Sequence, residues 1–236
     1  MCGRFLTPDE SAFERFFELK PPEGYRRSFN VAPSQLAAVI RTRRDGSRAA
    51  ELFVWGYKPR WAERAWINAR AETVFTSRAF ADSARSRRCL VPAAGWYEWQ
   101  GERAPKQPYV HFRGEFAPIA FAGIWTTSSP PRSSERARRG QRDAVPNEPG
   151  EPLRTFAILT RDATSDVAHV HDRMPAVLAP EHYATWLDPN AARDALERIL
   201  LAPGPEVLTR RISMRVNKPE HDDADCIAPL DETGTG

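Results

Sequence analysis

The sequence predicts an α+β fold: a single domain in which a curved, barrel-like and mostly antiparallel sheet is flanked by a few helices. A series of short apolar runs, separated by Gly and Pro turns, has the length and spacing of β-strands. Helical spacing of apolar residues is confined to a few segments. With 236 residues, 41% of them hydrophobic, the chain is long enough to bury a substantial core.

The first expected element is a helix near residues 8–20. Thr7-Pro8-Asp9-Glu10 supplies an N-cap, a proline at the first helical position and a capping-box glutamate. Phe13, Phe16 and Phe17 would lie on one face of this helix. Packing of that face should hold the N-terminus close to the body of the protein.

Strands are expected in the apolar runs that follow Asn30-Val31-Ala32-Pro33, because turn residues separate these runs. Curvature of the resulting sheet would bring its ends together as in a barrel. The expected strands are 36–40, 52–55, 89–91, 96–99, 109–112, 119–125, 156–159 and 207–212.

Two more helices are expected late in the chain. One follows Pro180 and continues through Trp186. The other follows Asn190, which is a favourable N-cap residue, and has Leu196 and Leu200 at helical spacing. These helices would flank the sheet.

The domain is expected to span residues 2–220. Residues 128–151 are rich in proline and charge, which predicts a disordered surface insertion between two strands. Its basic part, 132–142, either contacts nucleic acid or is an ordinary solvated loop. The acidic tail 221–236 is expected to be loose.

Composition narrows the class of protein. The three cysteines are odd in number and show no Cys-x-x-Cys spacing, which argues against a disulfide framework or a zinc ribbon and favours a reducing cytoplasm. No signal segment or long apolar run is present, so a cytoplasmic protein with no membrane partner is expected. The net charge is +3, with a basic first half and an acidic second half. This asymmetry indicates either a local polyanion-binding surface or an ordinary solvated surface.

Cys2 directly follows the initiator Met1 and is the first candidate functional residue. Removal of Met1 would give Cys2 a free α-amine beside its thiol. The amine can condense with an aldehyde to form an imine, and the thiol can then close a five-membered thiazolidine ring. These groups titrate at about 7.7–8.0 and about 8.5, so both reactive forms are accessible near neutral pH. The alternative is an incidental cysteine at a frayed terminus.

Two strand-like segments carry candidate polar residues. An extended chain would place Asn68, Arg70 and Glu72 on one face, joining a hydrogen bonder to an anion-binding fork, unless a turn and an Arg70–Glu72 salt bridge form instead. Glu98 would share a face with Trp96, and apolar surroundings raise a carboxylate pKa toward the range useful for proton transfer. The alternative is an edge-strand glutamate that faces water.

The segment His169-Val170-His171-Asp172-Arg173 offers an acid/base histidine beside a phosphate-binding arginine. Its two histidines also suggest a metal site, but no third ligand has matching spacing. A solvent-facing turn is the plainer alternative.

The segment from Trp55 to Trp61 interleaves aromatic residues with Lys58 and Arg60. Bases of a single strand stack on such rings while the cations meet phosphates. Core tryptophans with exposed neighbours would give the same pattern.

Together and in this order, these segments resemble the SOS-response-associated peptidase family, the abasic-site processing proteins. The resemblance covers roughly residues 2–217. The motifs that carry it are Met-Cys-Gly-Arg-Phe at the start, Asn30-Val31-Ala32-Pro33, Trp55-Gly56, Asn68-Ala69-Arg70-Ala71-Glu72-Thr73, Arg88-Cys89-Leu90-Val91-Pro92-Ala93, Gly95-Trp96-Tyr97-Glu98-Trp99, Ala122-Gly123-Ile124-Trp125 and His171-Asp172-Arg173-Met174-Pro175.

The resemblance implies that Cys2, freed of Met1, captures abasic sites in single-stranded DNA as a thiazolidine DNA–protein crosslink, which shields the lesion. The family's catalytic asparagine, glutamate and histidine fall on Asn68, Glu98 and His171. No metal or organic cofactor is implied. A monomer is expected, cytoplasmic and associated with the nucleoid during DNA damage. DNA contacts are expected from Arg4, Arg70 and Arg173 at phosphates and from Trp61 and Trp66 as stacking residues.

The chain departs from the family pattern at Ala94, where Asp is frequent, and at Thr126, where Glu is frequent. Both departures bear on local packing or DNA contacts. A weak lyase side reaction would follow from the same imine. Two alternatives remain at this stage: a peptidase with Cys2 as N-terminal nucleophile, and a noncatalytic single-strand binding module.

Overall fold

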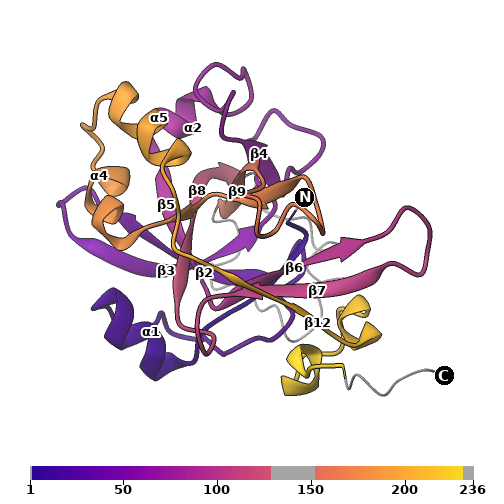
Figure 1. Ribbon diagram of the computed structural model, residues 1–236. Coiled ribbons are helices and arrows are strands. Elements are labelled where there is room, and N and C mark those ends of the chain that lie inside the picture. Colours follow the sequence, from indigo (N-terminus) through magenta and orange to yellow (C-terminus); the bar gives the residue numbers. More distant parts are fainter. Residues whose placement is uncertain (1, 129–151, 231–236) are drawn as a thin grey trace.

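The computed structural model describes residues 2–128 and 152–230, and strands from both parts close into a ring (Figure 1). Around the ring, β9 neighbours β3 and β8, β3 neighbours β2, and β5 joins β2 to β8. All these pairs are antiparallel except β3 with β9. The expected curved, mostly antiparallel sheet is therefore confirmed. The ring strands are β2 (Leu36–Thr42), β3 (Arg48–Trp55), β5 (Arg88–Ala93), β8 (Ile119–Ser128) and β9 (Leu153–Asp162).

A second, antiparallel sheet has the order β1-β6-β7-β12. Its strands are β1 (Arg4–Leu6), β6 (Gly95–Gln100), β7 (Gln107–Phe112) and β12 (Leu208–Arg211). The chain passes from β5 of the ring to β6 through Ala94 alone. A Cβ at Gly95 would lie 2.5 Å from the carbonyl oxygen of His111, so this close approach requires glycine.

Short strands line one end of β9. β4 (Asn68–Arg70) runs parallel to β9, and β10 (Arg173–Pro175) runs antiparallel to it. Thr160 of β9 is in register with both Arg70 and Pro175. Two segments distant in sequence, around Asn68 and His171, therefore flank the same end of one strand. β11 (Val177–Leu178) continues the chain alongside β8.

Helices cover the outside of the ring: α1 (Glu10–Phe17), α2 (Ala81–Ser86), the 3-10 turn η2 (Pro180–His182), α4 (Tyr183–Leu187) and α5 (Arg193–Leu201). Trp186 and Leu196 pack with the strand residues Ile40 and Leu90 in one cluster. Trp55 and Phe121, on the opposite face of the strands, pack in the cluster that contains Cys2. The helices pack against the outer face of the strands in the first cluster, so the second cluster fills the interior of the ring.

Two helix boundaries differ from those expected. α1 begins at Glu10, with Asp9 and not Thr7 as its N-cap; the Asp9 carboxylate accepts the Ala12 N–H at 2.8 Å. Thr7 instead bonds Ser28 through both its backbone and its hydroxyl. α5 begins at Arg193 and not directly after Asn190, whose N–H is held in a turn by Asp188.

Residues 129–151 of the expected insertion 128–151 lie outside the described residues, and Ser128 completes β8. The tail was expected to be loose from residue 221, but residues 221–230 pack against the protein. They contain η4 (Ala224–Ile227), which contacts η3 (Met214–Asn217). Residues 231–236 lie outside the described part. No helix among the described residues has the length and apolar character needed to cross a membrane.

Candidate active site

Cys2 precedes the short strand β1, which pairs with β6 in the register Arg4 to Tyr97. The Cys2 side chain is fully buried, and its thiol contacts the Arg4 carbonyl oxygen at 3.8 Å. The side-chain amide of Asn68 donates to the Cys2 carbonyl oxygen at 2.8 Å. Cys2 is therefore held in place and is not part of a frayed terminus.

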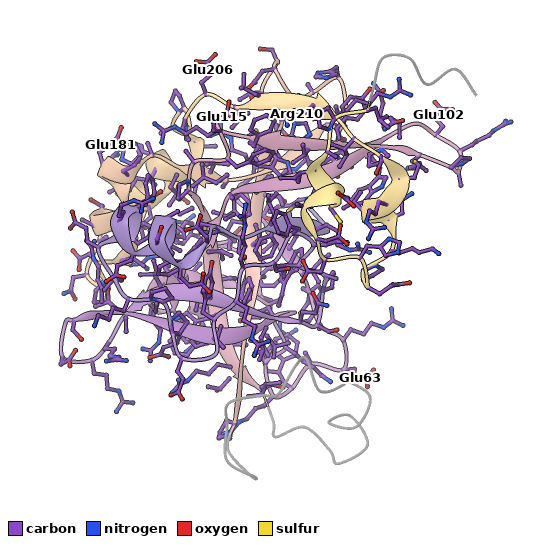
Figure 2. All side chains as sticks on the ribbon, turned by 90° about the horizontal axis from the view of Figure 1, so that it is seen from below. Glu63, Glu102, Glu115, Glu181, Glu206 and Arg210 are labelled. Carbon is purple, nitrogen blue, oxygen red and sulfur yellow. The ribbon has the colours of Figure 1, made fainter. Side chains whose placement is uncertain are left out.

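Glu98 of β6 is buried, with 3% of its surface exposed. Its neighbours alternate as expected: Trp96 packs in the cluster of Cys2, whereas Tyr97 and Trp99 pack in a different one. Burial raises the pKa of Glu98 from its ordinary 4.5 to about 7. Five other glutamates are instead exposed, and Figure 2 shows their side chains pointing outward: Glu63, Glu102, Glu115, Glu181 and Glu206.

The Glu98 carboxyl acts electrostatically on the Cys2 thiol. Burial, followed by the negative charge of Glu98, raises the pKa of Cys2 well above that of an ordinary thiol. At neutral pH the thiol is therefore protonated, while Glu98 is close to its titration midpoint. A group that titrates near neutral pH beside a nucleophile is suited to accept and return a proton.

Asn68 lies on β4 with one free acceptor. Its Oδ1 is buried and has no hydrogen-bond partner in the part of the chain that the structure describes, although Nδ2 is bonded to Cys2. Thr160 of β9 is fully buried, and its hydroxyl likewise lacks a partner among the described residues. The register pairs Asn68 with Ile158, two residues before Thr160, so both polar groups are on the same face of the sheet.

Thr160 was not identified from the sequence. Thr160 lies on the same face of β9 as Phe156 and Ile158, whose side chains pack in the ring interior with Cys2. The sequence signal that could have identified Thr160 is a hydroxyl at an inward-facing position of an apolar strand. Buried polar groups without partners are rare in proteins, and a ligand is one explanation for such a group.

His171 lies just before β10. Its Nδ1 is 3.0 Å from the Arg173 backbone N–H and 2.8 Å from an Asp172 carboxylate oxygen. The first contact requires a bare nitrogen and the second a protonated one. Burial lowers the pKa of His171, and the Asp172 side chain is exposed to solvent, so the neutral ring that accepts from Arg173 is favoured. The ring proton then lies on Nε2, where it can be donated.

The loop carrying His171 is tied to the strand carrying Glu98. The Gln100 side chain, two residues after Glu98, donates to the His169 carbonyl oxygen at 2.7 Å. The carboxylate of Asp172 adds to the effect of burial on the pKa of Glu98. The structure thus brings together residues expected to be catalytic from four separate parts of the chain: Cys2, Asn68, Glu98 and His171.

Arg70 and Arg173 have different surroundings. Arg173 donates to both carboxylate oxygens of Glu72 (2.7 and 2.9 Å), to Asp162 (2.5 Å) and to the Thr160 carbonyl oxygen (2.7 Å). Arg70 is exposed and makes no side-chain hydrogen bond or ion pair with the residues described. The Arg70–Glu72 salt bridge weighed from the sequence is therefore replaced by an Arg173–Glu72 pair.

The remaining residues expected to contact DNA are Arg4, Trp61 and Trp66. Arg4 is half-buried and donates to the Asn30 side chain (3.1 Å) and the Val216 carbonyl oxygen (3.0 Å). Trp61 is 65% exposed, and its ring centre lies 5.9 Å from that of Trp66. Their contacts with DNA stay predictions. No group of three or more His, Cys, Asp or Glu suited to a metal ion occurs within residues 2–128 and 152–230.

The sequence and the fold are similar to those of known proteins. The family model described as SOS response associated peptidase (SRAP) matches residues 1–219. The abasic site processing protein YoaM of Bacillus subtilis is 32% identical, with 96% of this chain and 97% of that protein covered. The abasic site processing protein YedK of Escherichia coli is 29% identical over 98% of this chain and all of that protein. The crystal structure of a phage-related protein from Bordetella bronchiseptica superimposes with a TM-score of 0.67 at 29% identity, covering 91% of this chain and 95% of that one.

Proposed function

Because the chain belongs to the SOS response associated peptidase (SRAP) family, we propose that it acts at abasic sites in damaged DNA. Relatives that match nearly the whole chain are named abasic site processing proteins. The finer proposal is that Cys2, once Met1 is removed, captures the aldehyde of an abasic site in single-stranded DNA as a thiazolidine crosslink.

The proposed reaction has two covalent steps. The α-amine of Cys2 attacks the sugar aldehyde carbon, and the resulting carbinolamine loses water to give an imine. The thiol sulfur then adds to the imine carbon, and its proton moves to the nitrogen, which closes the ring. The DNA and protein together lose one water, and no metal, organic cofactor or oxidant is required.

Glu98 is the proposed proton carrier in both steps. With its pKa near 7, it can accept a proton from the ammonium group and return one when water leaves. It can also take the thiol proton that ring closure releases. The single observation that carries the proposal is this buried carboxyl beside the buried Cys2, which Asn68 holds by its carbonyl oxygen.

The other site residues act on the sugar and phosphates in this proposal. His171, with its proton on Nε2, donates to the deoxyribose ring oxygen and so favours the open aldehyde. The unpartnered Oδ1 of Asn68 accepts a hydrogen bond from a hydroxyl of the opened sugar. The Thr160 hydroxyl can donate to a sugar or phosphate oxygen. Arg70, exposed at the end of β4, meets a flanking phosphate. Trp61 and Trp66 supply rings on which bases stack.

Intact mass spectrometry tests the proposal. The purified protein is measured alone and after incubation with a single-stranded oligonucleotide that carries one abasic site. We expect a protein without Met1 that gains the oligonucleotide mass less one water and stays crosslinked on heating. A Cys2→Ala variant should bind the DNA but gain no mass.

Two outcomes would contradict capture. Processed protein that never gains mass, but cleaves a peptide in a Cys2-dependent way, would favour the peptidase suggested by the family description. Binding that Cys2→Ala leaves unchanged, with no covalent product in either protein, would favour a noncatalytic binding module.

A further inference from the structure

Asp222 holds the loop that supports the N-terminal strand. Its Oδ1 accepts three hydrogen bonds, from the Ser28 hydroxyl (3.0 Å), the Phe29 N–H (2.5 Å) and the Asn30 N–H (3.1 Å). Asp222 lies beyond residue 219, where the match to the family ends. One carboxylate oxygen from this C-terminal segment therefore fixes three consecutive residues of a distant loop.

Asn30 extends this connection. It is 1% exposed, and its side-chain amide donates to carbonyl oxygens of Val216 (3.2 Å), Lys218 (3.1 Å) and His221 (2.8 Å). Its Oδ1 accepts from Arg4. Asn30 thus joins the C-terminal segment to a residue of β1, two positions after Cys2.

The same loop pairs directly with β1. Val31 and Phe5 exchange backbone hydrogen bonds of 2.8 and 3.3 Å. The C-terminal segment also contacts β6, because Asn217 accepts the indole N–H of Trp99 at 2.6 Å. The two strands that place Cys2 and Glu98 are therefore braced by one segment.

We propose that Asp222 is a positioning residue for the capture reaction, and that it acts by fixing the loop 28–31 and through it the strand that ends at Cys2. This inference rests on the proposed function. β1 has only three residues and lies at the edge of its sheet, so it needs support beyond its pairing with β6. A nucleophile must be held close to its reactive geometry, and small displacements cost rate.

The test compares Asp222→Ala with Asp222→Asn. Alanine removes the acceptor, whereas the asparagine side-chain oxygen can still accept all three bonds. Asp225→Ala is the matched control, because Asp225 lies in the same segment and its side chain is exposed. Two quantities are measured: the first-order rate of crosslinking at saturating abasic-site oligonucleotide, and the affinity for an oligonucleotide with an unreactive tetrahydrofuran site.

Asp222→Ala removes the shared acceptor of three hydrogen bonds to the loop, so it should slow crosslinking at least about fivefold, with affinity unchanged within about twofold. Asp222→Asn and Asp225→Ala should react at the wild-type rate. The inference is overturned if Asp222→Ala reacts normally, if asparagine fails to restore the rate, or if affinity falls as much as rate.

A second measurement separates this inference from the proposed function. Cys2 and Cys89 are both fully buried, and Cys89 lies in the ring strand β5. Iodoacetamide labelling of Cys2 should be about tenfold faster in Asp222→Ala, with Cys89 labelled at the wild-type rate. If the wild-type protein captures no abasic site, the proposed function fails, and the labelling result still decides whether Asp222 positions Cys2. Equal labelling of Cys2 in both proteins would overturn the inference.

Discussion

Cys2 and Glu98 illustrate what local environment adds to residue type. The chain has many carboxylates, yet burial singles out Glu98 and raises its pKa to about 7. The same burial keeps the Cys2 thiol protonated, so the proposed ring closure needs a proton acceptor. The pairing of β1 with β6 places Cys2 and Glu98 on neighbouring strands.

The raised pKa of Glu98 predicts a pH-dependent stability. The protonated form is favoured by the folded state, so its contribution is fully present below pH about 4.5 and is lost as pH rises through about 7. Glu98→Gln removes this dependence. The variant should therefore gain stability over the wild type between pH 5 and 8, on the order of 2–3 kcal/mol. Denaturant unfolding across this range measures it, and a constant difference between the proteins would show that the pKa is not raised.

Thr160 gives a second prediction at the residue scale. Thr160→Val replaces an unpartnered buried hydroxyl with a methyl group, so stability should stay equal or rise by about 1 kcal/mol. DNA capture should nevertheless weaken if the hydroxyl serves the substrate. Thr155→Val on the same strand is the control: its hydroxyl accepts the Lys58 N–H at 3.0 Å, and its loss should cost about 1 kcal/mol. A Thr160→Val protein with normal capture would remove Thr160 from the site.

At the scale of elements, Arg88 joins two helices to the ring. It is 5% exposed and donates to carbonyl oxygens at the C-terminal ends of α2 and α4, including those of Trp186 (2.7 Å) and Ala84 (2.8 Å), and also those of Arg85 and Asp188. The terminal carbonyl groups of a helix lack partners within the helix and carry partial negative charge. The buried cation therefore satisfies them without a carboxylate.

Arg88→Ala should lower the free energy of unfolding by about 3–5 kcal/mol, because it leaves several buried carbonyl groups without donors. Arg85→Ala, which removes an exposed pair with Asp82 on the same helix, should cost less than about 1 kcal/mol. Urea unfolding compares the two variants. Equal losses would mean that Arg88 does not connect the helices to the ring.

At the scale of the whole molecule, the arginines near the site differ in whether carboxylates neutralise their charge. Arg173 is matched by Glu72 and Asp162, whereas Arg70 projects into solvent. A cation that is already neutralised releases fewer counterions from DNA. The two arginines therefore have different expected effects, although the sequence motif presents them alike.

Arg70→Ala should weaken binding to single-stranded DNA and lower the slope of log affinity against log salt by about 0.7. Arg173→Ala should change this slope less, and should slow capture more, because the lost side chain forms the ion pairs with Glu72 and Asp162 that hold the strand next to His171. Fluorescence anisotropy between 50 and 200 mM salt measures the slopes. Equal slopes for Arg70→Ala and the wild type would place Arg70 away from the DNA.

The strongly patterned parts of the fold were predictable from the sequence. Apolar runs of three to seven residues marked the ring strands, and alternation correctly placed Trp96 and Tyr97 on opposite faces. The three-residue strands β1 and β10 were not predicted, because so short a segment has no measurable period. The N-cap of α1 was assigned to Thr7 because Asp9 and Thr7 are both good caps, and only the contact of Thr7 with Ser28 distinguishes them.

The sequence by itself determined which residues are candidates for chemistry, because Cys2, Asn68, Glu98 and His171 stand in recognisable local motifs. The tertiary structure alone decided their environments. Burial of Glu98, the acceptor state of His171, the pairing of Arg173 with Glu72 and the bracing of β1 by Asp222 all depend on contacts between distant segments. Electrostatic energies depend on the distance between groups and on the exclusion of water, and both are set by contacts between segments that are distant in the sequence.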